Sequence, residues 1–231
     1  MKAYVWGGTS DIGTVLIHHW LEQGWDVSTN YKREPLVVDE PWDVLMTCVA
    51  TMKPIAPFLD CKFREWEDSI RINFTDHAYL LHQALPKRKP NATVILWSGP
   101  GTNNAPLNYS AEIVSKIAQI KLCELLAAEI PDCRFVIIGP GWVKTKIHQE
   151  TLDAGAAAGT NLERTKEQNK WTPMSRIVEF VDWVIQQPVE AVSGRNFSIV
   201  GDIWGNAELI SMLASTPDAF KLRRHLNDWR P

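Results

Sequence analysis

Cysteine is scarce in this sequence, and long apolar runs are absent from it. Only four of its 231 residues are cysteines, they lie far apart, and no two form a Cys-x-x-Cys pair: Cys48, Cys61, Cys123 and Cys133. We therefore expect reduced thiols and no bound metal. No run approaches the roughly 18 apolar residues that a membrane helix needs, and the chain opens on a strand-like segment without the features of a signal peptide. These absences predict a cytoplasmic protein.

A surplus of positive charge is also lacking. The 24 lysines and arginines stand against 27 aspartates and glutamates, which gives a formal net charge of -3. The short basic run at residues 87–89 lies between two prolines and is typical of a solvated loop. We therefore expect neither nucleic acid nor a membrane as a partner.

What the sequence does contain is an alternation of short apolar runs with amphipathic stretches. Strands are predicted at residues 3–6, 25–29, 44–48, 93–97, 134–138 and 196–200, and helices at 12–23, 63–85, 108–129 and 175–186. This order is typical of an α/β fold, here a single Rossmann-type domain over residues 1–231. We expect a doubly wound parallel sheet of six to seven strands with helices on both faces.

The segment from about 146 to 172 breaks this pattern. It is rich in Ala, Gly, Thr, Asn and charge and has no long apolar stripe. Ligands of doubly wound sheets bind beyond the carboxyl ends of the strands, so an insertion that follows a strand there predicts a mobile substrate lid. An ordinary pair of exposed helices is the alternative.

A glycine-rich turn at residues 7–13 directly follows the first predicted strand and opens the first helix. Glycines let the backbone turn tightly against a pyrophosphate, and the helix N-terminus offers free amides and partial positive charge. The turn therefore predicts a dinucleotide site with these contacts: Gly7, Thr9, Ser10, Asp11, Ile12 and Gly13.

The end of the second predicted strand bears on the choice of dinucleotide. No acidic residue stands there to bind a ribose diol, whereas Lys32 and Arg33 would suit a 2′-phosphate. NADP(H) is therefore favoured over NAD(H), with two solvated charges as the alternative reading. Asp39 would end a further short strand and cap the adenine amino group.

Glu112 and Lys116 are spaced to share one face of the helix predicted at 108–129. A tyrosine four residues before a lysine would make a proton donor, because the ammonium lowers the pKa of the phenol. Here the donor position is a carboxyl group with an ordinary pKa of about 4.3. Since Lys116 favours the charged form, we expect Glu112 to be an ionised acceptor at neutral pH.

These motifs occur in the order found in the short-chain dehydrogenase/reductase family, which the chain resembles along nearly its full length. The glycine turn matches with Asp11 at the middle glycine, Asn73 matches the helix asparagine of the proton relay, and residues 115–118 match the active-site lysine segment. The turn at 139–145 resembles the one that contacts the nicotinamide. The resemblance implies cofactor contacts there and from the lysine: Lys116, Pro140, Gly141, Val143 and Thr145.

The resemblance implies hydride transfer between a nicotinamide and a carbonyl or alcohol, but two catalytic positions differ. Counted from Lys116, the family's tyrosine falls on Glu112 and its serine on Gly99, with Ser98 one residue earlier. Three accounts stay open. Tyr109 supplies the phenol with Ser98 or Ser110, Glu112 acts as a general base, or the protein binds a dinucleotide without ordinary turnover.

The substrate end of the sequence is less informative. Trp142 and His148 follow the predicted nicotinamide turn and are candidates to contact a small-molecule substrate. A weak likeness to reductases of bacterial surface-sugar pathways suggests a polar, sugar-derived substrate. The family habit of pairing through two long helices, here 63–85 and 108–129, implies a homodimer or homotetramer.

Overall fold

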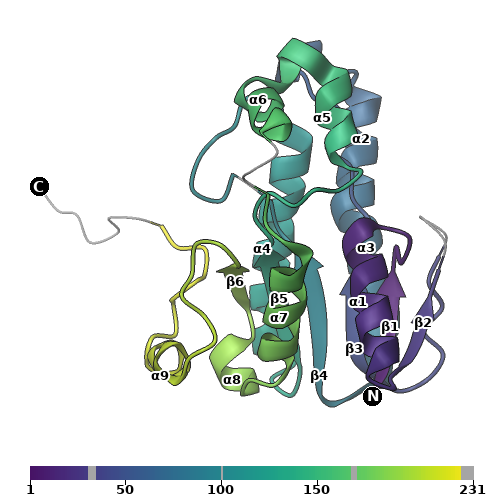
Figure 1. Ribbon diagram of the computed structural model, residues 1–231, viewed down its shortest axis with the longest axis vertical. Helices are drawn as coiled ribbons and strands as arrows, with labels where there is room; N and C mark the ends of the chain where they lie inside the picture. The colour runs from purple at the N-terminus through teal and green to yellow at the C-terminus, as the bar shows by residue number, and fades with distance from the viewer. Residues whose placement is uncertain (31–34, 100, 168–170, 225–231) are drawn as a thin grey trace, which may run out of the picture.

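The computed structural model describes residues 1–30, 35–99, 101–167 and 171–224. Its strands form one parallel sheet in the order β2-β1-β3-β4-β5-β6 (Figure 1). Their bounds are β1 Lys2–Trp6, β2 Asp26–Thr29, β3 Trp42–Thr47, β4 Arg88–Trp97, β5 Arg134–Gly139 and β6 Arg195–Ser198. The predicted Rossmann-type sheet is confirmed, with six strands in the part of the chain that is described.

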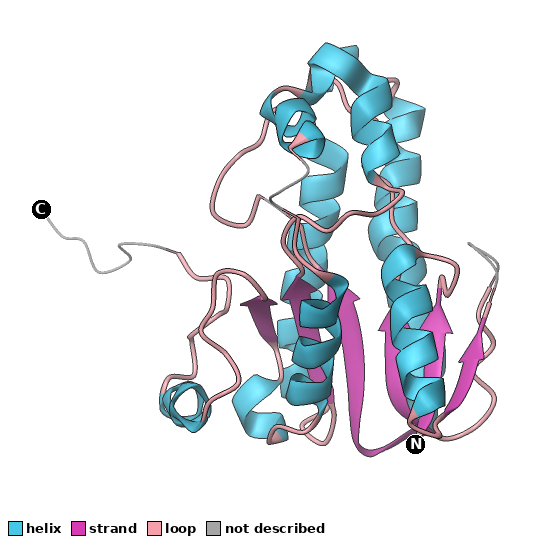
Figure 2. Cartoon of the chain, in the orientation of Figure 1, coloured by secondary structure: helices cyan, strands magenta, loops and turns pink. Residues whose placement is uncertain are grey.

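Helices cover both faces of this sheet (Figure 2). The first four are α1 Asp11–Glu22, α2 Phe63–Ile70, α3 Asp76–Ala84 and α4 Ser110–Glu129. The later ones are α5 His148–Ala154, α6 Thr160–Lys166, α7 Met174–Ile185, α8 Val189–Val192 and α9 Ala207–Ser215. The sequence prediction missed α8 and α9, which flank the last strand.

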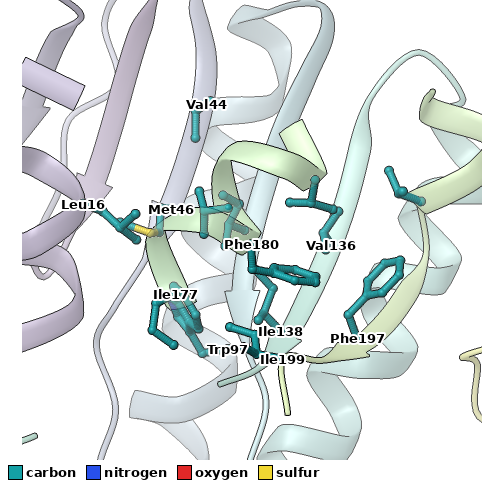
Figure 3. Packing of buried hydrophobic residues seen from close by; sticks show 14 of the residues in the cluster. Leu16, Val44, Met46, Trp97, Val136, Ile138, Ile177, Phe180, Phe197 and Ile199 are labelled. Atoms are coloured by element: carbon teal, nitrogen blue, oxygen red, sulfur yellow. The ribbon is translucent and has the colours of Figure 1, made fainter. Parts of the chain in front are cut away.

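Two apolar cores lie on the two faces of the sheet because neighbouring strand residues point in opposite directions. In β4, Ile95 and Trp97 face the core that is built with α1 and α7, whereas Val94 and Leu96 face the core that is built with α3 and α4. Figure 3 shows the first core, in which Phe180 of α7 lies among side chains of the strands. Burial on both faces explains the continuous apolar run in β4.

The predicted helix at 63–85 is α2 and α3 joined by a π-helical turn at Arg71–Thr75. Such turns insert one residue into a helix and often occur at functional sites. The turn contains Asn73, whose side chain is fully buried. The remaining strand and helix predictions agree with the structure to within a few residues, apart from an early start of β4.

The short strand that was predicted to end at Asp39 is wrong, because the described residues 35–41 contain no strand. Pro35 and Pro41 bracket this segment and lack the amide proton that a strand needs. The main-chain carbonyls of Val38 and Asp39 accept hydrogen bonds from the Lys87 side chain. Since no strand of this segment pairs with β2, β2 forms one edge of the sheet.

Within the described residues, no helix combines the length and hydropathy needed to cross a bilayer. The four cysteines, all of which are described, are free thiols.

Candidate functional site

A cavity of about 420 Å³ is lined by residues that follow the carboxyl ends of β1, β3, β4 and β5 and by residues of α5 and α6. Figure 1 shows α5 and α6 above these ends of the strands. Its lining brings together most of the residues predicted for the site: Ser10, Asp11, Ile12, Ser98, Tyr109, Glu112, Lys116, Pro140, Gly141, Trp142, Val143, Thr145 and His148. Segments that are far apart in the sequence therefore meet where a doubly wound sheet binds its ligands.

Other predicted residues lie elsewhere. Gly7, Thr9 and Gly13 shape the glycine turn without lining the cavity, and Asn73 lies behind the wall. The Asp39 carboxylate accepts a hydrogen bond of 2.7 Å from the Tyr4 hydroxyl. Lys32 and Arg33 fall outside the described residues.

The glycine turn forms a cradle that a side chain would fill. Gly7 has a φ of 83°, in the left-handed region that favours glycine, and a Cβ at Gly13 would lie 2.7 Å from the Ser10 Oγ. That Oγ accepts a hydrogen bond of 3.0 Å from the Gly13 amide and so caps α1. Because Ser10, Asp11 and Ile12 line the cavity, the N-terminus of α1 opens into it. This arrangement fits the pyrophosphate of a dinucleotide.

Glu112 and Lys116 lie one turn apart on α4, and each is only 7% exposed. The Lys116 ammonium donates a hydrogen bond of 2.8 Å to the Trp97 carbonyl at the end of β4. Burial raises the pKa of Glu112 from 4.5 to about 7, and the charge of Lys116 opposes this rise. Burial also lowers the pKa of Lys116, against the opposing effect of Glu112.

The expectation that Glu112 is fully ionised at neutral pH is therefore corrected. Removal of the carboxyl from water outweighs the attraction of the ammonium. A carboxyl with a pKa near 7 is suited to both giving and taking a proton at neutral pH.

Asn73 connects three elements behind the cavity. Its side chain exchanges hydrogen bonds of 2.9 and 2.8 Å with the main chain of Thr51, and its carbonyl accepts one of 2.7 Å from Gln119 of α4. The residue therefore supports the loop that follows β3.

His77 was missed in the sequence, although it stands four residues after Asn73. It lines the cavity, and its ring nitrogens lie 2.9 Å from the Thr47 hydroxyl and 2.9 Å from the Val49 carbonyl. Burial lowers its pKa to about 3, with a smaller effect of Lys116, so the ring is neutral. The spacing of four after Asn73, on a helix that faces the end of β3, was the signal that could have revealed it.

The predicted lid contains α5 and α6 and is held by two carboxylates. Glu150 of α5 accepts hydrogen bonds of 3.0 Å from the Thr51 hydroxyl, 2.6 Å from the Met52 amide and 3.2 Å from the Lys53 amide. Asp11 accepts one of 2.7 Å from the Lys146 amide. Glu150 was also missed, because its partners are about a hundred residues away.

In the aromatic pair predicted for the substrate end, Trp142 follows β5 and His148 is the first residue of α5. The His148 ring is centred 4.6 Å from the Trp142 ring and 5.0 Å from the Trp171 ring. Its Nε2 lies 2.9 Å from the Val143 carbonyl, and burial lowers its pKa. The ring forms part of the cavity wall.

Three hydroxyl groups were predicted as substitutes for the catalytic tyrosine and serine of the family, and their surroundings differ. The Ser98 hydroxyl donates a hydrogen bond of 3.0 Å to the Asn196 side chain, and Ser110 accepts one of 3.1 Å from Trp66 of α2. Tyr109 is 4% exposed, and its hydroxyl has no hydrogen-bond partner within the described part of the chain. Of the three, only Tyr109 offers a buried hydroxyl beside the cavity that is not already bound.

The fold and the site together define a Rossmann-type nucleotide-binding domain. Residues 38–200 match a family model described as Enoyl-(Acyl carrier protein) reductase. The chain belongs to the short-chain dehydrogenase/reductase family of oxidoreductases, whose members use nicotinamide dinucleotides and act on small molecules. A search of curated proteins finds no match.

Solved structures show the same fold at low sequence identity. A short-chain dehydrogenase/reductase of Saccharomyces cerevisiae has a TM-score of 0.72 and 18% identity, over 90% of this chain and 97% of its own. A small-chain dehydrogenase in complex with NADPH gives 0.73 and 19%, over 86% and 95%. A short-chain dehydrogenase of Shigella flexneri complexed with NADP gives 0.70 and 16%, over 86% and 96%.

Proposed function

We propose that this protein is an NAD(P)(H)-dependent oxidoreductase that interconverts a carbonyl compound and an alcohol, with Glu112 exchanging the proton. The observation that carries the proposal is the position of the Glu112 carboxyl. It lines the same cavity as Lys116 and the N-terminus of α1, and burial raises its pKa to about 7. A bound nicotinamide dinucleotide would supply or accept the hydride.

The residues of this chain would divide the remaining work. The amides at the start of α1 and the Ser10 hydroxyl would hold the pyrophosphate, and Thr145 and Lys116 would hold the nicotinamide half. Protonated Glu112 would donate its proton to the carbonyl oxygen in reduction, and ionised Glu112 would take the proton from the alcohol in oxidation. A positioned acid–base group contributes about a hundredfold to ten-thousandfold in rate.

NADP(H) remains the favoured cofactor in this proposal. Thr29 and Asn30, the described residues at the end of β2, are not acidic, and Asn30 accepts a hydrogen bond of 2.9 Å from the Gly7 amide. Because neither of these two residues carries a carboxylate, neither would repel a 2′-phosphate. The complexes of two similar proteins with NADPH and NADP agree with this choice.

The substrate is better described as apolar than as sugar-derived. On the side of the lid, the cavity is lined by Met52, Pro106, Ile113, Trp142 and Ile147. Apolar walls with few polar groups favour a ligand with a hydrophobic body. We infer an aldehyde, a ketone or the corresponding alcohol with such a body, and we infer that α5 and α6 close over it as a lid.

One observation favours a second candidate, a dinucleotide-binding protein without ordinary turnover. Gly99 carries no hydroxyl, and the hydroxyl of Ser98 is bound to Asn196. A substrate carbonyl would therefore lack the second hydrogen bond that the family's serine provides.

Binding and consumption of the cofactor separate the two candidates. NADPH and NADH fluorescence is titrated with the pure protein, and aldehydes and ketones with apolar bodies are then compared with sugar phosphates between pH 5 and 9. The first candidate predicts consumption with apolar carbonyls and a pH profile that bends near pH 7. Binding without consumption supports the second candidate, and no binding of either nucleotide refutes both.

We also infer that the protein is a homodimer or homotetramer that pairs through α2, α3 and α4. Large apolar side chains are exposed on and beside these helices: Phe58, Phe63, Tyr79 and Val114. Gel filtration that shows a monomer would refute this inference.

A further inference from the structure

Gly99 lies directly in front of the Glu112 carboxyl. A Cβ placed on Gly99 would lie 2.7 Å from the Glu112 Oε1. Its three nearest atoms, Oε1, Cδ and Oε2, all belong to this one carboxyl group. A heavy atom of another residue essentially never lies within 3.0 Å of a Cβ atom in a protein. The carboxyl therefore occupies space that a side chain at position 99 would need.

The backbone does not explain a glycine at this position. Gly101 and Gly141 have φ angles of 109° and 77°, which side chains rarely adopt, whereas the φ of Gly99 lies outside that range. The φ angle of Gly99 therefore does not require a glycine. The carboxyl of Glu112 is the group that a side chain at position 99 would meet and displace.

We propose that Gly99 is a positioning residue for Glu112, because the missing side chain lets the carboxyl lie against the end of β4 at the cavity wall. The proposal deepens the proposed function, since it concerns the same acid–base group. The positioning itself is a property of the folded protein and is measurable without turnover.

A methyl group at position 99 would move the carboxyl more than the backbone, because the carboxyl is the end of a flexible side chain. The open direction is the cavity, since Glu112 lines it. A carboxyl that moves into the cavity regains water, and its pKa falls towards 4.5 because burial is the main cause of the raised value.

Several titratable groups share the cavity with Glu112, and they come from every element around it. They are Lys116 of α4, Cys48 after β3, His77 of α3, Tyr109, Asp11 of α1, and Lys146, His148 and Glu150 of the lid. Burial keeps the Cys48 thiol neutral, with a pKa of about 12, and keeps His77 neutral as well. Lys116 is the charge with a resolved effect on the pKa of Glu112, and the variants below do not change it.

The test is a titration of Glu112 by carbon NMR on protein with ¹³C-labelled glutamate, with the resonance assigned by its absence in Glu112→Gln. The native protein should titrate near pH 7, and Gly99→Ala should titrate at least one pH unit lower. Gly139→Ala is the matched control at the end of the neighbouring strand, because its Cβ would lie 3.2 Å from the Ser98 Oγ and would not have Glu112 among its three nearest atoms. It should leave the titration of Glu112 unchanged.

A titration near pH 7 in both Gly99→Ala and the native protein would overturn the proposal. If Gly99→Ala does not fold, Gly99→Ala/Glu112→Ala decides. Recovery of folding in the double variant supports the contact with the carboxyl, and failure to recover overturns it. A lowered pKa in Gly99→Ala together with no turnover of the native protein would support the positioning role and refute the proposed function alone.

Discussion

Replacing Glu112 by glutamine removes a group that makes the folded protein less stable as the pH rises. Burial raises the pKa of this carboxyl from 4.5 to about 7. In the unfolded chain the proton leaves near pH 4.5, whereas the folded protein keeps it until about pH 7. The folded state therefore binds more protons between these values, and its stability falls as the pH rises through them.

The size of the effect follows from the pKa shift. Each pKa unit corresponds to 1.36 kcal/mol, so the native protein should lose about 3 kcal/mol of unfolding free energy between pH 4.5 and 8 because of Glu112. The glutamine variant has the same shape at this position and no titration. His77 contributes with the opposite sign, since its pKa is lowered to about 3, but it does so equally in both proteins.

The assay is urea unfolding, followed by tryptophan fluorescence at pH 5, 6, 7 and 8, for the native protein and Glu112→Gln. The difference in unfolding free energy between the two should increase by about 2 to 3 kcal/mol in favour of the variant over this range. Glu129→Gln is the control, because Glu129 is exposed on the same helix, and its curve should run parallel to the native one. Parallel curves for Glu112→Gln as well would refute the raised pKa.

Three further changes test the neighbouring groups. Lys116→Met should raise the pKa of Glu112 above 7, because the Lys116 ammonium of the native protein lowers that pKa; carbon NMR measures this effect. The same change should weaken NADPH binding, which fluorescence titration measures. Asn73→Ala should cost about 2 to 3 kcal/mol of unfolding free energy, because it leaves buried groups of Thr51 without partners; an unchanged urea midpoint would contradict this. Glu150→Gln should loosen α5 and α6, since a single amide oxygen replaces the carboxylate that accepts bonds from residues 51–53. Faster proteolytic cleavage in α5 or α6 and a higher KM are expected, with Glu163→Gln as the exposed control.

The order of the elements could be read from the sequence because it depends on periodicities along the chain. Buried parallel strands appear as apolar runs, and helices appear as amphipathic stretches between them. The π turn inside the helix at 63–85 and the absence of a strand before Asp39 were not readable in this way. In both places the structure shows hydrogen bonds to residues that are distant in the sequence. Asn73 of the π turn is bonded to Thr51 and Gln119, and the main chain at Asp39 is bonded to Lys87.

The candidate site, too, could be predicted from the sequence only in part. The glycine turn and the spacing of Glu112 and Lys116 are local patterns, and the structure brings both to one cavity. Glu150 and His77 carried weaker signals, because their contacts join residues that are distant in the sequence. Our proposal of an apolar substrate depends on the tertiary structure in the same way, since the cavity lining comes from segments that are far apart in the sequence.

The sequence by itself determined the parallel α/β fold, the family resemblance and the altered acid–base position, because each is set by residues close together in the chain. Only the tertiary structure decided what the alteration means. Burial of Glu112 outweighs the attraction of Lys116, so the carboxyl that was expected to be ionised at neutral pH has a pKa of about 7 instead. Gly99 shows the same dependence on the tertiary structure. Its lack of a side chain leaves room for the carboxyl of Glu112, thirteen residues later in the chain, and the two residues meet only in the folded protein.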